Sequence, residues 1–480
     1  MKYLDLAMNA ATSLGVEYAD IRIQKTTDQV IYLQNLSLKH TGTEVIHGYG
    51  IRVFKDGAWG FAHSNVFSDE AVLATVKKAV DIAALSAQVN VHKKLRLAPE
   101  RSYIASYKTP VQIDPMDVPL SEKVDLMMEV NRTMMAFEGI KKAVFYLIMH
   151  KDEKLFASTL GTRLEIEYQF IDPMIIATAN LDGDSQSRTF DEGGRAVGWE
   201  WILSLDLIEK AKQIAQEALI KVKADTLGPE QRRSLILDPN HLGLTMHESV
   251  GHPTELDRVL GWEADFAGIS FATPEKLKNY RYGSEIVNFV GDNTLAEGLA
   301  TMGFDDDGVP GQKWHIIKDG ILNEYGSTRD TAMEIGLNYS RGCNRATYYY
   351  DQPINRIPNL YLLPGTKLLT PGELIADTED GVLIQGRGSF SIDQHRVNFQ
   401  FGGDFFWEIK NGKLHRPLKK VLYKSCNPEF WNSCDAICDE RFWRPFGVVN
   451  CGKGQPGQSA RMTHGSAPAR FRSIRVGGSQ

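Results

Sequence analysis

The chain has 480 residues, which is too long for one ordinary hydrophobic core and predicts two or three domains. A hydrophobic content of 42% and a charged content of 24% are typical of a soluble globular protein. The formal net charge of −6, without a long basic run, argues against direct nucleic-acid binding, and no apolar stretch reaches the ~18 residues that span a bilayer.

Helix and strand patterns follow one another in blocks through the first half of the chain. Apolar residues at helical spacing predict helices, whereas alternating β-branched and aromatic residues between turn signals predict antiparallel strands. Residues 88–118 are polar and contain proline, so we expect a connection there. The expected elements are a helix over 4–14, a strand meander over about 19–64, a helix over 69–87 capped by Ser68, a helix over 121–137, strands over 142–190 and a helix over 204–223.

The best linker candidate is the polar segment 225–233, which holds Gly and Pro together. We therefore expect an N-terminal domain over 1–228 and a C-terminal domain over 229–480. The second half opens with a short strand and a helix, and beyond about residue 280 it reads as β-rich, with hairpin signals at Asp319-Gly320 and Asn411-Gly412. These blocks predict an α+β fold, with an antiparallel sheet and helices followed by a β-rich domain that carries the helix described next.

That helix contains His247-Glu248-Ser249-Val250-Gly251-His252, an H-E-x-x-x-H cluster suited to a divalent metal and a water-activating base. Successive residues of a regular helix rotate by ~100°, so histidines at i and i+5 would diverge by roughly 140°. Gly251 permits unusual dihedral angles, and Pro253 disfavours the helical conformation at His252. We predict that His247 lies on the helix and that His252 lies at a π-type distortion or at the helix end.

A zinc site needs a third protein ligand, and the cluster does not provide one. A thiolate binds zinc well, which modestly favours Cys451, and Cys343 remains a competitor by the same reasoning. Three histidines of the second half are further candidates for substrate contact or for support of the ligands, although each is singly more typical of an ordinary structural residue: His315, His395 and His464. The cluster itself has a plainer interpretation as a solvated helix face.

Three other patterns carry weaker signals. Gly452, Gly454 and Gly457 spell G-x-G-x-x-G, but Pro456 interrupts it and no amphipathic helix follows, so we expect a glycine-rich turn beside Cys451. The run 305–308 (DDDG) lacks the acidic residue that completes a calcium loop and reads as an acidic turn. The remaining thiols lack paired metal-ligand spacing and are expected to be unligated: Cys426, Cys434 and Cys438.

The chain carries five cysteines, an odd number at low density, and its first twenty residues contain no continuous apolar segment of the kind found in signal peptides. Both features favour a reducing cytoplasm, in which free thiols are available as metal ligands.

Several motifs in a fixed order resemble the TldD/PmbA family, also called the modulator of DNA gyrase family. The resemblance spans nearly the whole chain, and the joint occurrence of the motifs makes it specific. They are YADIRIQ and GYGIRVFKDGAWGFAHS near the N-terminus, TMHESVGHPTELD, DDDGVPG, NRIPNLYLLPG, and CGKGQPGQSARMTHGSAPARFRSIRVG near the C-terminus.

This resemblance implies a cytoplasmic zinc metallopeptidase of the TldD kind, because the PmbA (TldE) kind lacks the H-E-x-x-x-H cluster. It implies one zinc per chain, held by His247, by His252 rather than Glu255, and by Cys451, with Glu248 as the general base on a metal-bound water. The implied substrate is an unfolded or extended peptide that adds as a strand to a sheet near the metal.

The resemblance also implies a dimer, formed either with a PmbA/TldE-like partner subunit or with a second copy of the chain. From the net charge of −6 and the lack of an apolar stretch that spans a bilayer, we expect no direct nucleic-acid contact and no membrane. The alternative hypothesis is a non-catalytic peptide-binding or scaffold subunit whose metal site is structural. A closed site with a fourth protein ligand such as His464 would favour it, because catalytic zinc keeps an open position.

Overall fold

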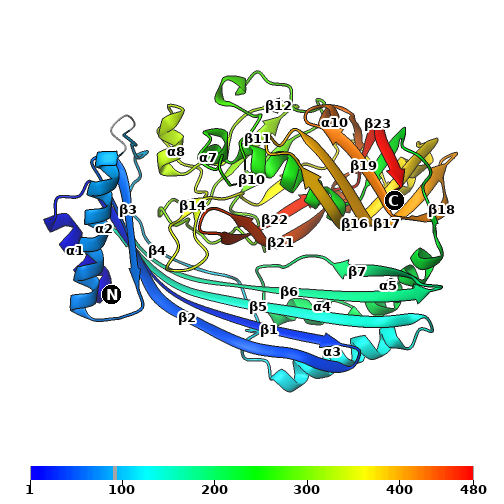
Figure 1. Cartoon of the computed structure of the whole chain (residues 1–480), viewed down its shortest axis with the longest axis horizontal. Helices are drawn as coiled ribbons and strands as arrows, with labels where there is room; N and C mark the ends of the chain where they lie inside the picture. The colour runs from blue at the N-terminus through cyan, green and yellow to red at the C-terminus, as the bar shows by residue number, and fades with distance from the viewer. Residues whose placement is uncertain (1, 90–93, 267, 479–480) are drawn as a thin grey trace.

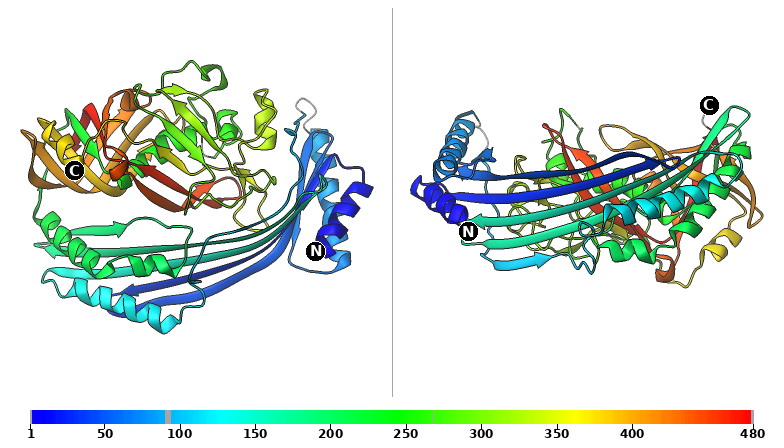
Figure 2. Two further views of the ribbon diagram at one scale, coloured as in Figure 1. Left: turned by 180° about the vertical axis from the view of Figure 1, so that it is seen from behind. Right: turned by 90° about the horizontal axis from the view of Figure 1, so that it is seen from below.

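The computed structural model describes residues 2–89, 94–266 and 268–478. A long, curved sheet from the first half of the chain lies alongside a compact, β-rich second half, as Figures 1 and 2 show. Helices flank the first sheet, whereas the second half consists mostly of strands and short helical turns. The α+β fold predicted from the sequence is confirmed.

The N-terminal sheet has the order β3-β2-β1-β5-β6-β4, and β7 also pairs with β6. All neighbours are antiparallel except β4, which pairs parallel with β6 and lies inside the segment expected to be a plain connection. Its short alternating sequence at a sheet edge gave too weak a pattern to be found. The strands are β1 (Tyr18–Gln34), β2 (Ser37–Lys55), β3 (Ala58–Ser64), β4 (Ile104–Lys108), β5 (Ile140–Ser158), β6 (Arg163–Leu181) and β7 (Asp184–Asp191).

Helices cover the two ends of this sheet (Figures 1 and 2). At one end the apolar faces of α1 and α2 bury residues such as Leu4 and Val76, and at the other end α3 and α5 pack over β5 and β6. The Ser68 hydroxyl accepts a hydrogen bond from the Ala71 amide at 3.1 Å, so the predicted cap of α2 is confirmed. The helices are α1 (Lys2–Ser13), α2 (Asp69–Val89), α3 (Leu120–Met135), α4 (Trp199–Ser204) and α5 (Leu207–Lys223).

The second half contains two larger sheets. One has the order β12-β11-β10-β15-β22-β21, and the other has the order β16-β9-β23-β19-β17-β18-β8. Because β16 also pairs with β17, strands β16, β9, β23, β19 and β17 close into a barrel. Their bounds are β8 (Asp225–Thr226), β9 (Gln231–Leu237), β10 (Phe289–Asp292), β11 (Lys313–Lys318), β12 (Ile321–Leu322), β15 (Leu360–Leu362), β16 (Asp380–Ile392), β17 (Asn398–Lys410), β18 (Lys413–Lys419), β19 (Val421–Cys426), β21 (Arg444–Lys453), β22 (Gln458–Ser466) and β23 (Ala469–Gly478).

Short elements complete this half. Asp319-Gly320 and Asn411-Gly412 lie between paired strands with positive φ at both residues, so both predicted hairpins are confirmed. The remaining elements are α6 (Pro239–Met246), η1 (His247–Gly251), η2 (His252–Thr254), α7 (Leu256–Val259), η3 (Pro274–Lys276), α8 (Arg329–Glu334), β13 (Asn344–Arg345), β14 (Ile354–Asn355), α9 (Pro371–Ala376), α10 (Glu429–Asn432), β20 (Cys434–Ile437) and η4 (Glu440–Phe442).

The DDDG segment forms the predicted turn, and it is buried between the two halves of the chain. Asp306 accepts from Lys154 at 2.6 Å and from Arg22 at 3.3 Å, both on the N-terminal sheet. Burial alone would raise the pKa of Asp306, but these two cations hold it at about 2. Asp307 pairs with Arg52 at 2.8 Å. The turn is therefore an ionic junction that fixes one half against the other.

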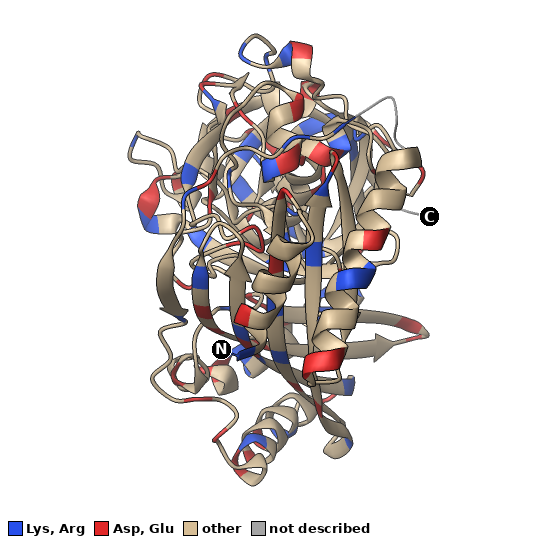
Figure 3. Cartoon of the chain, turned by 90° about the vertical axis from the view of Figure 1, so that its left-hand side faces the viewer, with Lys and Arg blue, Asp and Glu red and all other residues tan. Residues whose placement is uncertain are grey.

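Acidic and basic residues are interspersed over the face drawn in Figure 3, in keeping with the modest net charge. Among the residues that the structure describes, no helix is both long enough and apolar enough to cross a membrane.

Candidate metal centre

The H-E-x-x-x-H cluster lies where one helix changes its winding twice. Asp238 caps α6, with its side chain accepting from the His241 amide, and η1 then continues the helix as a π-turn over His247–Gly251. The amide of His252 donates to the carbonyl oxygen of His247, five residues earlier. This wider turn brings i and i+5 to one face, and the two imidazole centroids lie 4.7 Å apart. The predicted π-type distortion is confirmed.

The local reasons for the distortion differ from those expected. Gly251 has ordinary helical angles (φ −57°, ψ −65°), so its conformational freedom is not used. A Cβ atom there would lie 2.9 Å from Ile357 Cδ1, so glycine is present because the helix packs closely on its neighbour. His252 is helical (φ −61°, ψ −41°) although Pro253 follows it, and both residues belong to the 3-10 turn η2, which continues the helical path.

Cys451 reaches the two histidines from β21, at the end of the chain's second half. Strand β21 pairs with β22, and the Gly- and Pro-bearing residues 454–457 form the turn between them, as expected from the sequence. The register shifts between Val448 and Cys451, which is typical of a β-bulge that re-aims a side chain. The Sγ atom of Cys451 lies 3.6 Å from Nε2 of His252.

One donor atom from each of three buried residues falls in a small volume: His247, His252 and Cys451 have such atoms within 4.8 Å of one another. Ligand atoms of a tetrahedral zinc ion stand about 3.5 Å apart, given zinc–ligand bonds of roughly 2.0–2.3 Å. The 3.6 Å separation of the His252 and Cys451 donors already matches this spacing, so the residues present fit a zinc ion.

The protonation of these residues also suits a metal. Burial lowers the pKa of both His247 and His252, which keeps the imidazoles neutral. Burial alone would raise the pKa of the Cys451 thiol, and the guanidinium of Arg356 acts in the opposite direction. Neutral imidazole and thiolate are the forms that bind zinc.

Each of these two histidines contacts a second side chain through its Nδ1 atom. His247 Nδ1 lies 2.7 Å from Nε2 of His464, and His252 Nδ1 lies 2.8 Å from Oε2 of Glu255. Glu255 lies three residues after His252, a spacing at which helical neighbours meet, so the sequence contained a signal for this contact. His464 is on β22, and nothing local in the sequence relates it to His247.

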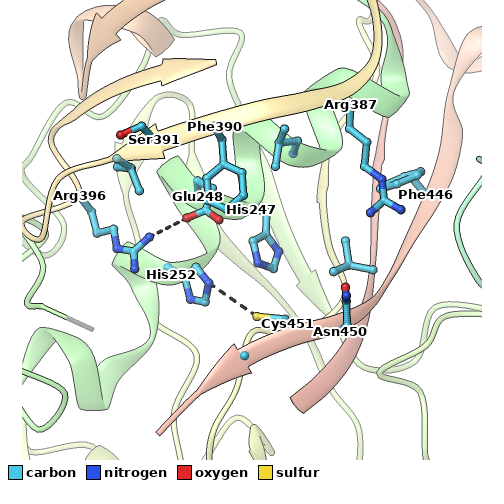
Figure 4. A pocket seen from close by; sticks show the side chains of 14 residues that line it. His247, Glu248, His252, Arg387, Phe390, Ser391, Arg396, Phe446, Asn450 and Cys451 are labelled. Atoms are coloured by element: carbon cyan, nitrogen blue, oxygen red, sulfur yellow. Dashed lines mark hydrogen bonds and ion pairs between the residues drawn. The ribbon is translucent and has the colours of Figure 1, made fainter. Parts of the chain in front are cut away.

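Glu248 points into a cavity of about 530 Å³ that His247, His252 and Cys451 also line (Figure 4). Its Oε2 atom accepts from Arg396 Nη1 at 2.6 Å. The other lining residues come from α6, from β16 and from β21. The sequence did not indicate those on β16 and β21, because they lie far from the cluster along the chain. They include Leu244, Arg387, Phe390, Ser391, Phe446, Val448 and Asn450.

Within the part of the chain that the structure describes, none of the remaining sequence candidates belongs to the three-donor cluster. Cys343 is buried in the core of the second half, where burial raises the pKa of its thiol to about 12. His315 is half-buried on β11, and His395 is exposed in the turn between β16 and β17. All five cysteines are free, and none of Cys426, Cys434 and Cys438 falls in a metal-ligand cluster of the described residues.

Three segments of the chain match the domains of one metallopeptidase family. Residues 19–83 match PmbA/TldA metallopeptidase domain 1, residues 113–224 match the central domain, and residues 230–478 match the C-terminal domain. The last match alone covers more than half of the chain and contains the whole donor cluster.

Individual relatives agree with this assignment. A metalloprotease of Methanocaldococcus jannaschii is 30% identical over 84% of this chain and 85% of its own length. A zinc metalloprotease TldD homolog of Saccharolobus solfataricus is 21% identical over 98% of each chain. The crystal structure of TldE from Thermococcus kodakarensis has the same fold, with a TM-score of 0.75 and 14% identity over 99% of this chain and 100% of that one. The chain therefore belongs to the PmbA/TldD metallopeptidase family and is a metalloprotease.

Proposed function

We propose that the protein is a zinc-dependent peptidase that cleaves unfolded or extended peptides, with His247, His252 and Cys451 as zinc ligands and Glu248 as general base. The observation that carries this proposal is the convergence of three buried donors within 4.8 Å beside a cavity that Glu248 also lines. Two imidazoles and a thiolate are a donor set that suits zinc, and the relative from Saccharolobus solfataricus is named a zinc enzyme.

Three protein donors are the number found in catalytic zinc sites, which keep a further position open for water and substrate. The alternative of a closed structural site would need a fourth protein ligand, and His464 is engaged at 2.7 Å with Nδ1 of His247 instead. Zinc bound here would polarise the scissile carbonyl and lower the pKa of water. The enzyme's own residues must then move one proton and hold the peptide.

Glu248 is the residue suited to move that proton. It takes a proton from the attacking water and delivers it to the leaving amine, so that the carboxylate is regenerated in each cycle. The hydrogen bond from Arg396 fixes the carboxylate through Oε2. Because Glu248 directly follows His247, it lines the same cavity as the three donors (Figure 4). Arg396 is thus a positioning residue for the base.

The strands around the cavity support binding of an extended peptide. β21 is the end strand of its sheet, and the alternating residues Phe446, Val448 and Asn450 line the cavity just before Cys451. A peptide added along this edge gains main-chain hydrogen bonds with little sequence preference. Phe390 on β16 faces the same cavity and offers an apolar surface for substrate side chains.

Substitution of the base tests the proposal. Glu248→Gln keeps the size and hydrogen-bonding reach of the side chain but removes its basicity. We expect cleavage of a quenched fluorescent unfolded peptide to fall by about 10²–10⁴-fold, while metal analysis finds the zinc content unchanged. The control is Glu209→Gln, because Glu209 is an exposed residue of α5 whose side chain is 66% accessible. Cleavage by the Glu248 variant at the control rate would remove Glu248 from the mechanism.

For the setting of this activity we propose the cytoplasm, because all five cysteines are free and a reducing compartment preserves the Cys451 thiol. The partner is a PmbA/TldE-like subunit or a second copy of this chain. The likeness of the whole fold to TldE supports a common architecture for two such subunits. Sedimentation of the chain alone and with a TldE-like protein distinguishes the two assemblies.

A further inference from the structure

We propose that His464 and Glu255 are positioning residues that fix the tautomers of His247 and His252, so that both imidazoles present an unprotonated Nε2 atom to the cation. This inference rests on the proposed zinc ligands and deepens that function. Neither residue belongs to the three-donor cluster, and both contact the far side of a donor imidazole.

Glu255 determines the state of His252. An ionised carboxylate can only accept hydrogen bonds, so the 2.8 Å contact between its Oε2 atom and His252 Nδ1 requires a proton on Nδ1. A neutral imidazole then carries a lone pair on Nε2, which is the atom that lies 3.6 Å from Cys451 Sγ. A carboxylate behind a ligating histidine also increases the basicity of the ligand.

The surroundings of Glu255 keep its charge and its position. The side chain is 1% exposed and lies 3.3 Å from Lys453 Nζ and 3.5 Å from Arg258 Nε. Lys453 is on β21, two residues after Cys451, and its Nζ atom also pairs with Asp257 at 2.7 Å. The same ionic group therefore orients His252 and ties the strand that carries Cys451 to the helical segment that carries the histidines.

His464 determines the state of His247 by a different route. Its Nδ1 atom lies 3.2 Å from the carbonyl oxygen of Leu360, which can only accept, so Nδ1 of His464 carries a proton. The ring is completely buried, and a second proton on it would place an uncompensated charge beside another imidazole. Nε2 of His464 consequently accepts from Nδ1–H of His247, and the proton-free atom of His247 is Nε2.

Strand pairing fixes the positions of the residues that form these two hydrogen bonds of His464. Leu360 on β15 is the direct partner of His464 on β22 in a parallel pair, and β22 pairs in turn with β21, which carries Cys451. Three neighbouring strands therefore supply the carbonyl that orients His464, the imidazole that orients His247, and the thiol ligand. A shift of one strand would disturb all three together.

A matched pair of amides separates the two hydrogen bonds of His464. His464→Gln places an acceptor near the position of Nε2 and can still accept from His247, whereas His464→Asn retains only the group nearer the backbone and can still donate to Leu360. The apparent zinc dissociation constant is measured by competition with a chromophoric chelator. We expect His464→Asn to weaken zinc binding by about 10–100-fold and His464→Gln to remain within about threefold of wild type.

Two further variants complete the measurement. Glu255→Gln is expected to weaken zinc binding by about tenfold or more, because the amide lacks the charge that makes His252 a stronger ligand. His415→Asn is the matched control, since His415 is an exposed residue of β18, and it is expected to bind zinc as the wild type does. Circular dichroism verifies that each variant is folded. If His464→Asn does not fold, the zinc affinities of the single variants Glu255→Gln and His464→Gln are compared instead.

Nitrogen NMR of the zinc-free protein, labelled with ¹⁵N-histidine, reports the tautomers directly. The wild type and His464→Gln are expected to show His247 protonated on Nδ1 alone, and His464→Asn to show a mixture of tautomers. Unchanged tautomers and unchanged zinc affinity in His464→Asn and Glu255→Gln would overturn the orienting role. His247→Ala distinguishes this from failure of the zinc site: if His247→Ala also binds zinc as tightly as the wild type, the ligand assignment itself is wrong.

Discussion

The buried lysine behind the donor cluster provides a stringent test of how the two segments of the site are held together. Lys453 is inaccessible to solvent, and its Nζ atom donates to Asp257 at 2.7 Å and to the carbonyl oxygen of Asn355 at 2.7 Å, with Glu255 at 3.3 Å. Lys453→Met retains the length and apolar stem of the side chain but removes the charge. Two buried carboxylates would then lose their shared cation.

The magnitude follows from this arrangement. Removing one partner of a buried ion pair costs about 3–5 kcal/mol, because the remaining charge stays in a poorly solvated site. For a domain of roughly 250 residues, each kcal/mol corresponds to about 2–4 °C in Tm. Lys453→Met should therefore lower the melting temperature of the metal-free protein by about 6–20 °C, measured by circular dichroism with a chelator present to exclude effects of zinc.

The same substitution at an exposed ion pair is the control. Lys77 and Asp81 pair at 2.7 Å on α2, with side chains 70% and 57% accessible, so Lys77→Met should change stability by less than about 1 kcal/mol. The double variant Lys453→Met/Asp257→Asn should recover part of the loss, because one of the two stranded charges is gone. If Lys453→Met melts within a degree of Lys77→Met, the ionic group does not hold the strand and the helical segment together.

Two further predictions concern pH and zinc. Burial, reinforced by Asp191, raises the pKa of Asp172 to about 7 from 3.8, so the folded state binds the extra proton between these values and stability should fall as pH rises from about 4 to 7. Asp172→Asn should flatten that decline, and its free energy of unfolding should exceed that of the wild type by about 2–4 kcal/mol at pH 8. The free energies are measured by urea unfolding, and parallel pH profiles for the two proteins would contradict this prediction. Zinc at 100 times its dissociation constant should stabilise the wild type by about 2.7 kcal/mol, and differential scanning fluorimetry should show no such shift for Cys451→Ala.

Secondary structure was largely predictable because it depends on local periodicity. The helical spacing of apolar residues identified α1, α2, α3 and α5, and the Asp-Gly and Asn-Gly turns identified two hairpins. The parallel edge strand β4 and the closure of the barrel through β16 and β17 were not predicted. Both depend on which strands meet across long sequence separations, and a single sequence carries little trace of such pairing.

The donor cluster was predictable in part. The i, i+5 spacing of His247 and His252 required a wider helical turn if one ion was to be shared, and the structure contains that π-turn. The reasons given for it were wrong, because Gly251 and His252 adopt ordinary helical angles and close packing against Ile357 explains the glycine. Periodicity could not supply the third donor, and family resemblance was needed to choose Cys451 over Cys343.

The sequence by itself thus determined which residue types were available and which local turns they would form, because propensities and spacing act over a few residues. The tertiary structure alone decided that Cys451 would lie beside His252, that Arg396 would hold Glu248, and that His464 would stand behind His247. Those contacts join residues about 150 to 220 positions apart, and their geometry is set by strand pairing and by the burial of charged groups rather than by any local pattern.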